Sequence, residues 1–599
     1  VRDEYKARRD TCMEGLKKIP GVVCECPKGA FYIMAKLPID DADKFQIWLL
    51  EEFEDNGETV QFSPAQSMYA TPGKGINEIR MAYVLEQHKL ARAMELLGGL
   101  EDADTVARQL LAQLEEEGMG RPHLAEDAAY DAALTAKLIA AISCDEATAA
   151  RIIDFVRTHA HAETDKATYQ AMEALIHNLN TMNSRAGAQV PFSSINYGMD
   201  TSPEGRLVMQ QVLLATDAGL GRGETPIFPI QIFRVKEGIN YNPEDPNYDL
   251  FKLAVRCSAK RLFPNFSFLD APFNKKFYRE GDYNTEVAYM GCRTRVMANN
   301  YDPTKAVVCG RGNLSFTSIN LPRLGIESNR DFDVFYKKLD NMLDLVSRQL
   351  LHRFRIQCSK KGRNYPFLMG QGIWIDSDNL GPDDSVEEVL KHGTLSIGFI
   401  GLAETMKALT GKHHGEDEES RKKAFEIIKH MREFCDKKSA ETGLNFTLLA
   451  TPAEGLSGRF VKIDREKYGK LPGITDRDYY TNSFHVPVYY PIGAFEKIAI
   501  EAPYHDLTNA GHISYVELDG DTARNVEAFE SIVRCMHDFG IGYGSINHPV
   551  DRDPICGYVG IIGDVCPRCG RREGEEIAPE RVEELKRLYP EMPAFHGIE

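Results

Sequence analysis

Leu444-Asn-Phe-Thr-Leu-Leu-Ala450, followed directly by Thr451-Pro-Ala-Glu-Gly-Leu-Ser-Gly-Arg459, is the stretch that decides the fold. Its first segment is a short, nearly continuous apolar run, which is typical of a β-strand buried on both faces. The second segment is a turn that leads into a helix. Pro226-Ile-Phe-Pro-Ile-Gln-Ile-Phe233 is another strand of this kind. Buried strands joined through helices are typical of an α/β fold with a parallel sheet.

Long amphipathic helices accompany these strands. Apolar residues recur at steps of three and four and therefore share one helix face. They are Phe332, Phe335, Leu339, Leu343, Val346 and Leu350. Strands that alternate with such helices from residue 166 to residue 545 predict a large α/β barrel.

Changes in composition divide the chain into four segments. Residues 1–99 combine helices and short strands, which predicts a small α/β lobe, and residues 100–165 are rich in Ala, Glu and Leu, which predicts a helical connector. Residues 166–545 form the predicted barrel. Residues 546–599 carry a cysteine cluster and end in a predicted capped helix from Ala578 to Pro590.

Composition and charge exclude several classes of protein. The net charge of −18 argues against a general nucleic-acid binder, because phosphate backbones require a basic face. No apolar run is long enough to span a membrane, and the start at Val1 is neither a signal peptide nor an initiator Met, so we expect the numbered chain to begin inside a longer frame. Thirteen scattered cysteines without a secretory signal indicate reduced thiols and a cytoplasmic location.

Three cysteines near the C-terminus predict a zinc site. Cys566-Pro-Arg-Cys569 can place two thiolates on one ion, and Cys556 lies within reach of a hairpin. A redox dithiol is the alternative, and it would require a thioredoxin-like context. The fourth ligand is open between His548 and a cysteine beyond residue 599.

Two polar segments are candidates for substrate binding. The run from His177 to Asn196 carries more amides and hydroxyls than an ordinary core, and within it we single out Asn183, Ser184 and Arg185. The turn after the strand 444–450 can expose backbone amides to a phosphate, with Thr451, Gly455 and Ser457 as the candidate contacts. A hydrogen-bonded loop and a plain helix cap are the alternative interpretations.

Cys292 stands in Ala288-Tyr-Met-Gly-Cys-Arg-Thr-Arg295, where a glycine precedes it and two arginines follow. Most lone cysteines are inert core residues. Two functional interpretations compete with that one: a thiolate nucleophile activated by the arginines, and a neutral thiol that transfers a hydrogen atom.

Several motifs together resemble one family. They are YQAMEALIHNLNTMNSRAGAQVPFSSINYG, NYNPEDPNYDLFKLA, AKRLFPNFSFLDAPFN, EVAYMGCRTRV, GRGNLSFTSINLPRLG, HGTLSIGFIGLAE, LLATPAEGLSGRF, YYTNSFHVPV and CGYVGIIGDVCPRCGR. This set, from about residue 101 to the C-terminus, resembles the anaerobic, glycyl-radical (class III) ribonucleoside-triphosphate reductases. The resemblance implies a ten-stranded α/β barrel, a thiyl radical on Cys292, an active-site amide at Asn313 and an acid/base carboxylate at Glu454.

The resemblance also implies partners and cofactors. Ribonucleoside triphosphates are the expected substrates, ATP and deoxynucleoside triphosphates the effectors, and a homodimer the assembly. An iron–sulfur enzyme that uses S-adenosylmethionine would create a glycyl radical in an Arg-x-x-Gly-Tyr context. We expect the numbered chain, which has no such stretch, to be truncated before it and inactive as it stands.

Residues 1–99 resemble a different family. PKGAFYIMAKLP followed by TPGKGINEIRMAYVL is similar to the C-terminal small domain of class I aspartate-type aminotransferases, which implies a catalytically dead fragment without its Schiff-base lysine. Besides the reductase, two functions stay open: a noncatalytic nucleotide-binding or assembly subunit, and a pyridoxal-phosphate aminotransferase based on this fragment alone.

Overall fold

The computed structural model places the chain in two compact units, Val1–Ala162 and Glu163–Glu599, which are described separately below. It describes residues 2–588 except 20, 40, 52, 54–57, 70, 72, 120–123, 125–127, 143–144, 185–186, 222, 520, 550, 554–555, 557, 561 and 573–577.

The first unit has a small antiparallel sheet with the strand order β1-β2-β4-β3. Its core contains Leu16, Ile33 and Ile79, which are fully buried. The predicted α/β lobe is therefore present, and the predicted connector is helical. The elements are α1 (Arg2–Lys18), β1 (Val23–Cys24), β2 (Tyr32–Lys36), α2 (Ala42–Glu51), β3 (Ser63–Pro64), β4 (Glu78–Ala82), α3 (Gln87–Glu116) and α4 (Ala128–Ile142), followed by α5 (Glu146–Thr181), which continues into the second unit.

The second unit is built on two sheets. One has five strands in the order β13-β14-β7-β6-β5, and the other has three in the order β10-β11-β12. All neighbours are parallel except β7 and β14, which are antiparallel. The strands are β5 (Ser194–Tyr197), β6 (Ile230–Val235), β7 (Asn265–Phe268), β10 (Asn313–Asn320), β11 (Thr394–Ile400), β12 (Asn445–Ala450), β13 (Ser514–Glu517) and β14 (Tyr543–Asn547).

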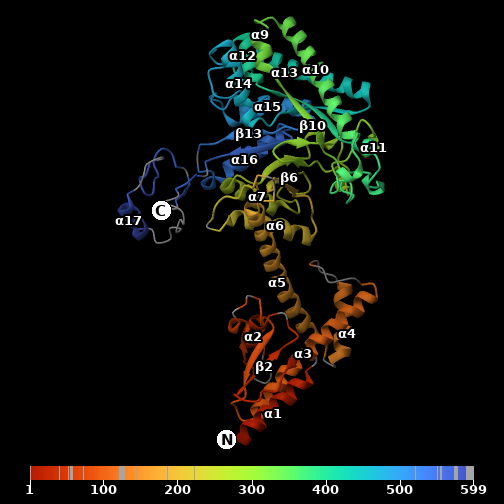
Figure 1. Cartoon of the computed structure of the whole chain (residues 1–599), viewed down its shortest axis with the longest axis vertical. Coiled ribbons are helices and arrows are strands. Elements are labelled where there is room, and N and C mark those ends of the chain that lie inside the picture. The colour runs from red at the N-terminus through yellow and green to blue at the C-terminus, as the bar shows by residue number, and fades with distance from the viewer. Residues whose placement is uncertain are drawn as a thin grey trace. The chain divides into compact units, whose positions relative to one another are not determined.

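Helices connect the parallel strands, and Figure 1 shows them around the strands of this unit. Because parallel neighbours need a crossover, nearly every pair of successive strands has at least one helix between them. These helices are α6 (Pro203–Ala218), α7 (Tyr248–Arg261), α8 (Pro272–Lys275), α9 (Leu321–Glu327), α10 (Phe332–Cys358), α11 (Glu387–Leu390), α12 (Leu402–Thr410), α13 (Glu418–Thr442), α14 (Glu454–Tyr468), α15 (Ala494–Leu507) and α16 (Val526–Asp538). Small elements complete the unit: β8 (Tyr289–Met290), β9 (Thr294–Arg295), β15 (Asp551–Arg552), β16 (Val559–Gly560) and α17 (Pro579–Leu588).

A backbone contact at Gly511 joins the two sheets. Gly511 pairs with Leu449 in parallel fashion, its carbonyl accepts from the amide of Ala450 at 3.1 Å, and β13 begins shortly afterwards. The two large sheets of the second unit thus form an α/β arrangement of five and three strands. The ten-stranded barrel implied by the family resemblance is not confirmed by this count.

Local expectations can be compared with these bounds. β12 is buried along its whole length, as the apolar run predicted. The helix predicted around residues 332–350 is α10, and the predicted face residues from Phe335 to Leu350 are buried. The strand predicted over 226–233 begins only at Ile230, because Pro226 and Pro229 lack the amide that a ladder requires. None of the described helices is long and apolar enough to cross a membrane.

Candidate active-site loop and metal centre

Cys292 lies at the tip of a hairpin formed by β8 and β9. The turn requires glycine at position 291, because its φ is +58° and an added Cβ would lie 2.8 Å from the ring of Phe192. Tyr289 and Arg295 in the stem are buried, whereas Cys292 is only partly buried. The hairpin therefore holds a rigid stem and presents one thiol at its tip.

Both arginines of the hairpin are bound elsewhere. Arg293 donates to the carbonyl of Thr451 at 3.1 Å, and Arg295 donates to the side chain of Asn274 at 2.9 Å and the carbonyl of Phe273 at 3.0 Å. No hydrogen bond described in the structure joins either guanidinium to the Cys292 thiol. The arginines are structural anchors here.

The hairpin tip lies beside the carboxyl end of β12. The backbone of Thr294 pairs with Gly511, and the amide of Arg295 donates to the carbonyl of Ala510 at 2.7 Å. Burial raises the pKa of Tyr515, and the nearby Arg293 opposes this shift. The guanidinium of Arg293 lies over the ring of Tyr515, 5.8 Å from its centre.

Asn313 occupies a different part of the sheet. It begins β10, in register with Thr394, and its amide donates to the hydroxyl of Thr394 at 3.1 Å and to that of Ser396. The turn at Thr451 follows the opposite, carboxyl end of β12. In the described part of the chain, no hydrogen bond connects Asn313 with the hairpin.

The turn before α14 has features of an anion site. No side chain caps the helix, and an added Cβ at Gly455 would meet nothing within 4 Å, so the first amides of α14 are approachable. Thr451 is buried and shares a hydrogen bond of 2.8 Å with Ser318, and the Ser457 hydroxyl donates to the carbonyl of Glu454 at 3.0 Å. The backbone, and not these two hydroxyls, is free for a ligand.

The other substrate candidates follow α5. Asn183 and Ser184 are exposed in the segment between α5 and β5, and Arg185 lies outside the described residues. No described contact brings Asn183 or Ser184 to the Cys292 hairpin.

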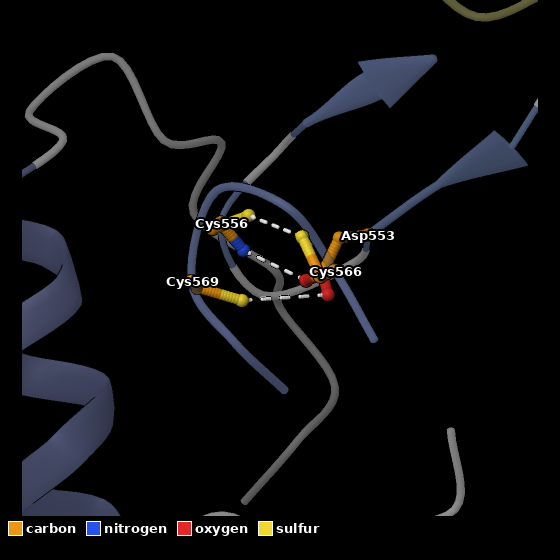
Figure 2. A group of neighbouring side chains, drawn as sticks. All are labelled: Asp553, Cys556, Cys566 and Cys569. Atoms are coloured by element: carbon orange, nitrogen blue, oxygen red, sulfur yellow. Dashed lines mark hydrogen bonds between the residues drawn. The ribbon is translucent and has the colours of Figure 1, made fainter. Parts of the chain in front are cut away.

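A four-residue cluster near the C-terminus has the geometry of a metal site. Figure 2 shows Asp553, Cys556, Cys566 and Cys569 directed toward a common centre, with their ligand atoms within 4.8 Å of one another. The sulfur atoms of Cys556 and Cys566 are 3.6 Å apart, and the Cys569 sulfur lies 3.6 Å from Oδ2 of Asp553. These separations match the edges of a tetrahedron with metal–sulfur bonds of about 2.3 Å.

Two turns of equal spacing build this cluster. Asp553 and Cys556 stand at one turn, where the Cys556 amide donates to Oδ1 of Asp553 at 3.0 Å. Cys566 and Cys569 stand at the other, which closes through the Gly570 amide and the Cys566 carbonyl at 2.8 Å. Burial raises the pKa of the Cys556 thiol to about 12.

His548 is not part of the cluster, which corrects the prediction from the sequence. Its Nε2 lies 3.0 Å from the carbonyl oxygen of Ser258, and its ring meets Phe529 edge-on. Asp553 occupies the position for which His548 and a more distant cysteine were proposed.

Comparisons with known proteins show the family of this chain. A family model described as "Anaerobic ribonucleoside-triphosphate reductase" matches residues 124–588. The chain belongs to this family. It is 34% identical to the anaerobic ribonucleoside-triphosphate reductase of Escherichia coli (strain K12) over 432 residues, which cover 71% of this chain and 59% of that protein. The same enzyme of Enterobacteria phage T4 is 34% identical over 443 residues, covering 72% of this chain and 69% of the phage protein.

Two further likenesses complete the comparison of this reductase-family chain. The anaerobic ribonucleotide reductase from Thermotoga maritima, solved with glycerol in the active site, superposes with a TM-score of 0.48 at 17% identity and covers 73% of this chain and 69% of that one. The aspartate aminotransferase of Pyrococcus horikoshii is 31% identical over 96 residues, which are 16% of this chain and 22% of that protein. This last match is partial.

The sequence contained a signal for the missed ligand of this reductase-family chain. Asp553-x-x-Cys556 has the same spacing as Cys566-x-x-Cys569, and two such pairs are the usual frame of a four-ligand zinc site. A search for histidine and cysteine ligands alone does not find the carboxylate of Asp553.

Proposed function

We propose that the chain carries the nucleotide-reducing part of an anaerobic ribonucleoside-triphosphate reductase, which converts ribonucleoside triphosphates to 2′-deoxyribonucleoside triphosphates. The observation that carries this proposal is the Cys292 hairpin in a chain of this family, with a partly exposed thiol at its tip and both neighbouring arginines bound elsewhere. A noncatalytic assembly role and an aminotransferase activity have no comparable support.

The chemistry follows from what a thiol can do. As a thiyl radical, Cys292 would remove the hydrogen atom at C3′ of the ribose and regain its S–H bond. The 2′-hydroxyl would then leave as water after accepting a proton, for which Glu454 is the nearest predicted acid. Two electrons from formate or a dithiol would complete the reduction, and returning the hydrogen to C3′ would regenerate the thiyl.

The substrate would bind at the carboxyl ends of the strands. The uncapped amides at the start of α14 are suited to the triphosphate, because a helix N-terminus carries partial positive charge. The family resemblance alone suggests Asn313 for the ribose hydroxyls, because this residue lies at the amino end of β10. Asn183, Ser184 and Arg185 remain secondary candidates for nucleotide contacts.

The proposal entails partners and a radical source. A glycyl radical would supply the oxidising equivalent for Cys292, and the printed sequence contains no Arg-x-x-Gly-Tyr stretch to hold it. The S-adenosylmethionine-dependent iron–sulfur activating enzyme, a second copy of the chain, and ATP or deoxynucleotide effectors complete the proposed assembly.

We also propose zinc as the metal of the C-terminal cluster. Three thiolates and one carboxylate complete four coordination positions, and a site with no open position is structural and not catalytic. Arg571, whose Nε lies 3.1 Å from Oδ2 of Asp553, offsets part of the negative charge of these ligands. The metal would hold two turns together where the chain offers little apolar core.

The test of the activity compares two cysteines. The glycine-bearing segment of a relative is appended after Glu599, the activating enzyme is supplied, and deoxynucleotide formation is measured. We expect Cys292→Ser to abolish product, because a serine O–H bond is too strong for a stored radical to break, while Cys309→Ser, at an exposed site, retains activity. Product from the Cys292→Ser protein would end the assignment of hydrogen transfer to this residue.

A further inference from the structure

The side-chain amide of Asn196 forms hydrogen bonds to the backbone of the Cys292 hairpin, as a peptide group would. Its Nδ2 donates to the carbonyl oxygen of Tyr289 at 2.9 Å, and its Oδ1 accepts from the amide of the same residue at 3.0 Å. One side chain thus satisfies both backbone groups of Tyr289, as a neighbouring strand would.

Ser194 adds a second contact from the same strand. Its hydroxyl accepts from the amide of Gly291 at 3.2 Å. Residues 194 and 196 share one face of β5 because side chains alternate along a strand. Ile195 and Tyr197, on the other face, pack with Ile176. The polar face of β5 is therefore committed to the hairpin and its apolar face to the core.

Further anchors of the hairpin come from segments outside β5. Gly511 pairs with the backbone of Thr294, and the guanidinium of Arg293 reaches the carbonyl of Thr451. The Tyr289 side chain is held as well: its hydroxyl lies 2.9 Å from Nε2 of His512, and its ring stacks on Tyr543. Asn196 and Ser194 add bonds to the backbone itself, at Tyr289 and Gly291.

We propose that Asn196 is a positioning residue that fixes the location of the Cys292 thiol by clamping the backbone at Tyr289. The role of this clamp in catalysis rests on the proposed function, because a thiol that transfers a hydrogen atom must lie within reach of one carbon atom of the substrate. The clamp itself is a property of the fold, and it can be measured without turnover.

The experiment measures the rate at which iodoacetamide alkylates Cys292 in the folded full chain, divided by the rate at exposed Cys309, by mass spectrometry. Asn196→Leu keeps the size of the side chain and removes both hydrogen bonds. We expect this ratio to rise about tenfold, which corresponds to the loss of two ordinary hydrogen bonds from a local opening equilibrium. Hydrogen exchange of the peptide containing Tyr289 should accelerate in parallel.

Two further variants make the result specific. Asn196→Asp keeps the acceptor for the Tyr289 amide but loses the amide donor, so an intermediate ratio is expected. Asn240→Leu is the matched control: this buried side chain also bonds backbone carbonyls, those of Gly198 at 2.9 Å and Arg234 at 2.8 Å, but it does not touch the hairpin.

An unchanged ratio in Asn196→Leu, or an equal rise in Asn240→Leu, overturns the proposal. If Asn196→Leu does not fold, the Asn196→Asp protein decides: a ratio equal to that of the wild type refutes the clamp, and an increase confined to Cys292 and the Tyr289 peptide supports it. Absence of reductase activity, by contrast, bears on the proposed function and leaves this result unaffected.

Discussion

Replacement of Asp553 by alanine should weaken zinc binding without unfolding the rest of the second unit. The carboxylate is 1% exposed and belongs to the group of four whose ligand atoms lie within 4.8 Å of one another. Structural zinc sites bind with roughly 10–16 kcal/mol, so one of four ligands contributes about 3 kcal/mol on average. That share corresponds to a loss of about 100-fold in affinity.

The assay is a competition for zinc between the protein and a coloured chelator at constant pH. Asp551→Ala is the matched control, because Asp551 lies two residues before Asp553 and accepts a hydrogen bond from the Ile562 amide at 2.9 Å, yet lies outside the cluster. His548→Ala is the second control. Asp553→Cys should restore tight binding and, with cobalt in place of zinc, strengthen the thiolate charge-transfer absorption.

The following outcomes would contradict this reasoning. If Asp553→Ala binds zinc as tightly as the wild type, or if His548→Ala loses affinity instead, the carboxylate is not a ligand and the cluster has been misread. A stoichiometry far below one zinc per chain that Cys566→Ser does not alter would refute the metal site as a whole.

Two other predictions concern the second unit. Gly291→Ala should lower deoxynucleotide formation at least tenfold with little change in melting temperature, because a side chain at its φ of +58° costs about 1–2 kcal/mol and the ring of Phe192 must move. Gly281→Ala is the control, since Gly281 has a φ of +77° but open space around it, and equal activity losses in both proteins would contradict the argument. Burial lowers the pKa of His505 to about 3, so the folded state resists protonation of this ring. The contribution of His505 to the free energy of unfolding is therefore full above the unfolded pKa of about 6.5, and it is lost as the pH falls from there toward 3. His505→Gln should reduce the slope of unfolding free energy against pH by up to about 1.4 kcal/mol per pH unit in that window, as measured by chemical denaturation, and an unchanged slope would show that this histidine is not the one being titrated.

The sequence predicted those elements whose pattern has a single physical meaning. The apolar run at β12 can only be a buried strand or a short buried helix, and the turn signals at Thr451 favour the strand. The face of α10 follows from its period. The start of β6 was misplaced, because an apolar composition conceals the missing amide of Pro229.

The site was predictable only in part. Cys292 stood out through Gly291 and the two arginines, but the roles of Arg293 and Arg295 depend on backbone carbonyls that lie far away in the sequence. Asp553 was missed although Asp553-x-x-Cys556 repeats the spacing of Cys566-x-x-Cys569, because acidic residues are common and mostly exposed; its burial beside the thiols sets it apart. The long-range bonds of the two arginines, by contrast, leave no local pattern in a single sequence.

The close approach at Gly511 offers a criterion for classifying other sequences. Its φ is +136°, and an added Cβ would overlap the carbonyl oxygen of Arg293, so a side chain at this position displaces the hairpin whatever residue stands at its tip. A homologous sequence that keeps the tip cysteine but has lost this glycine should therefore be suspected of having lost the reaction. The backbone position is then as informative for annotation as the thiol itself.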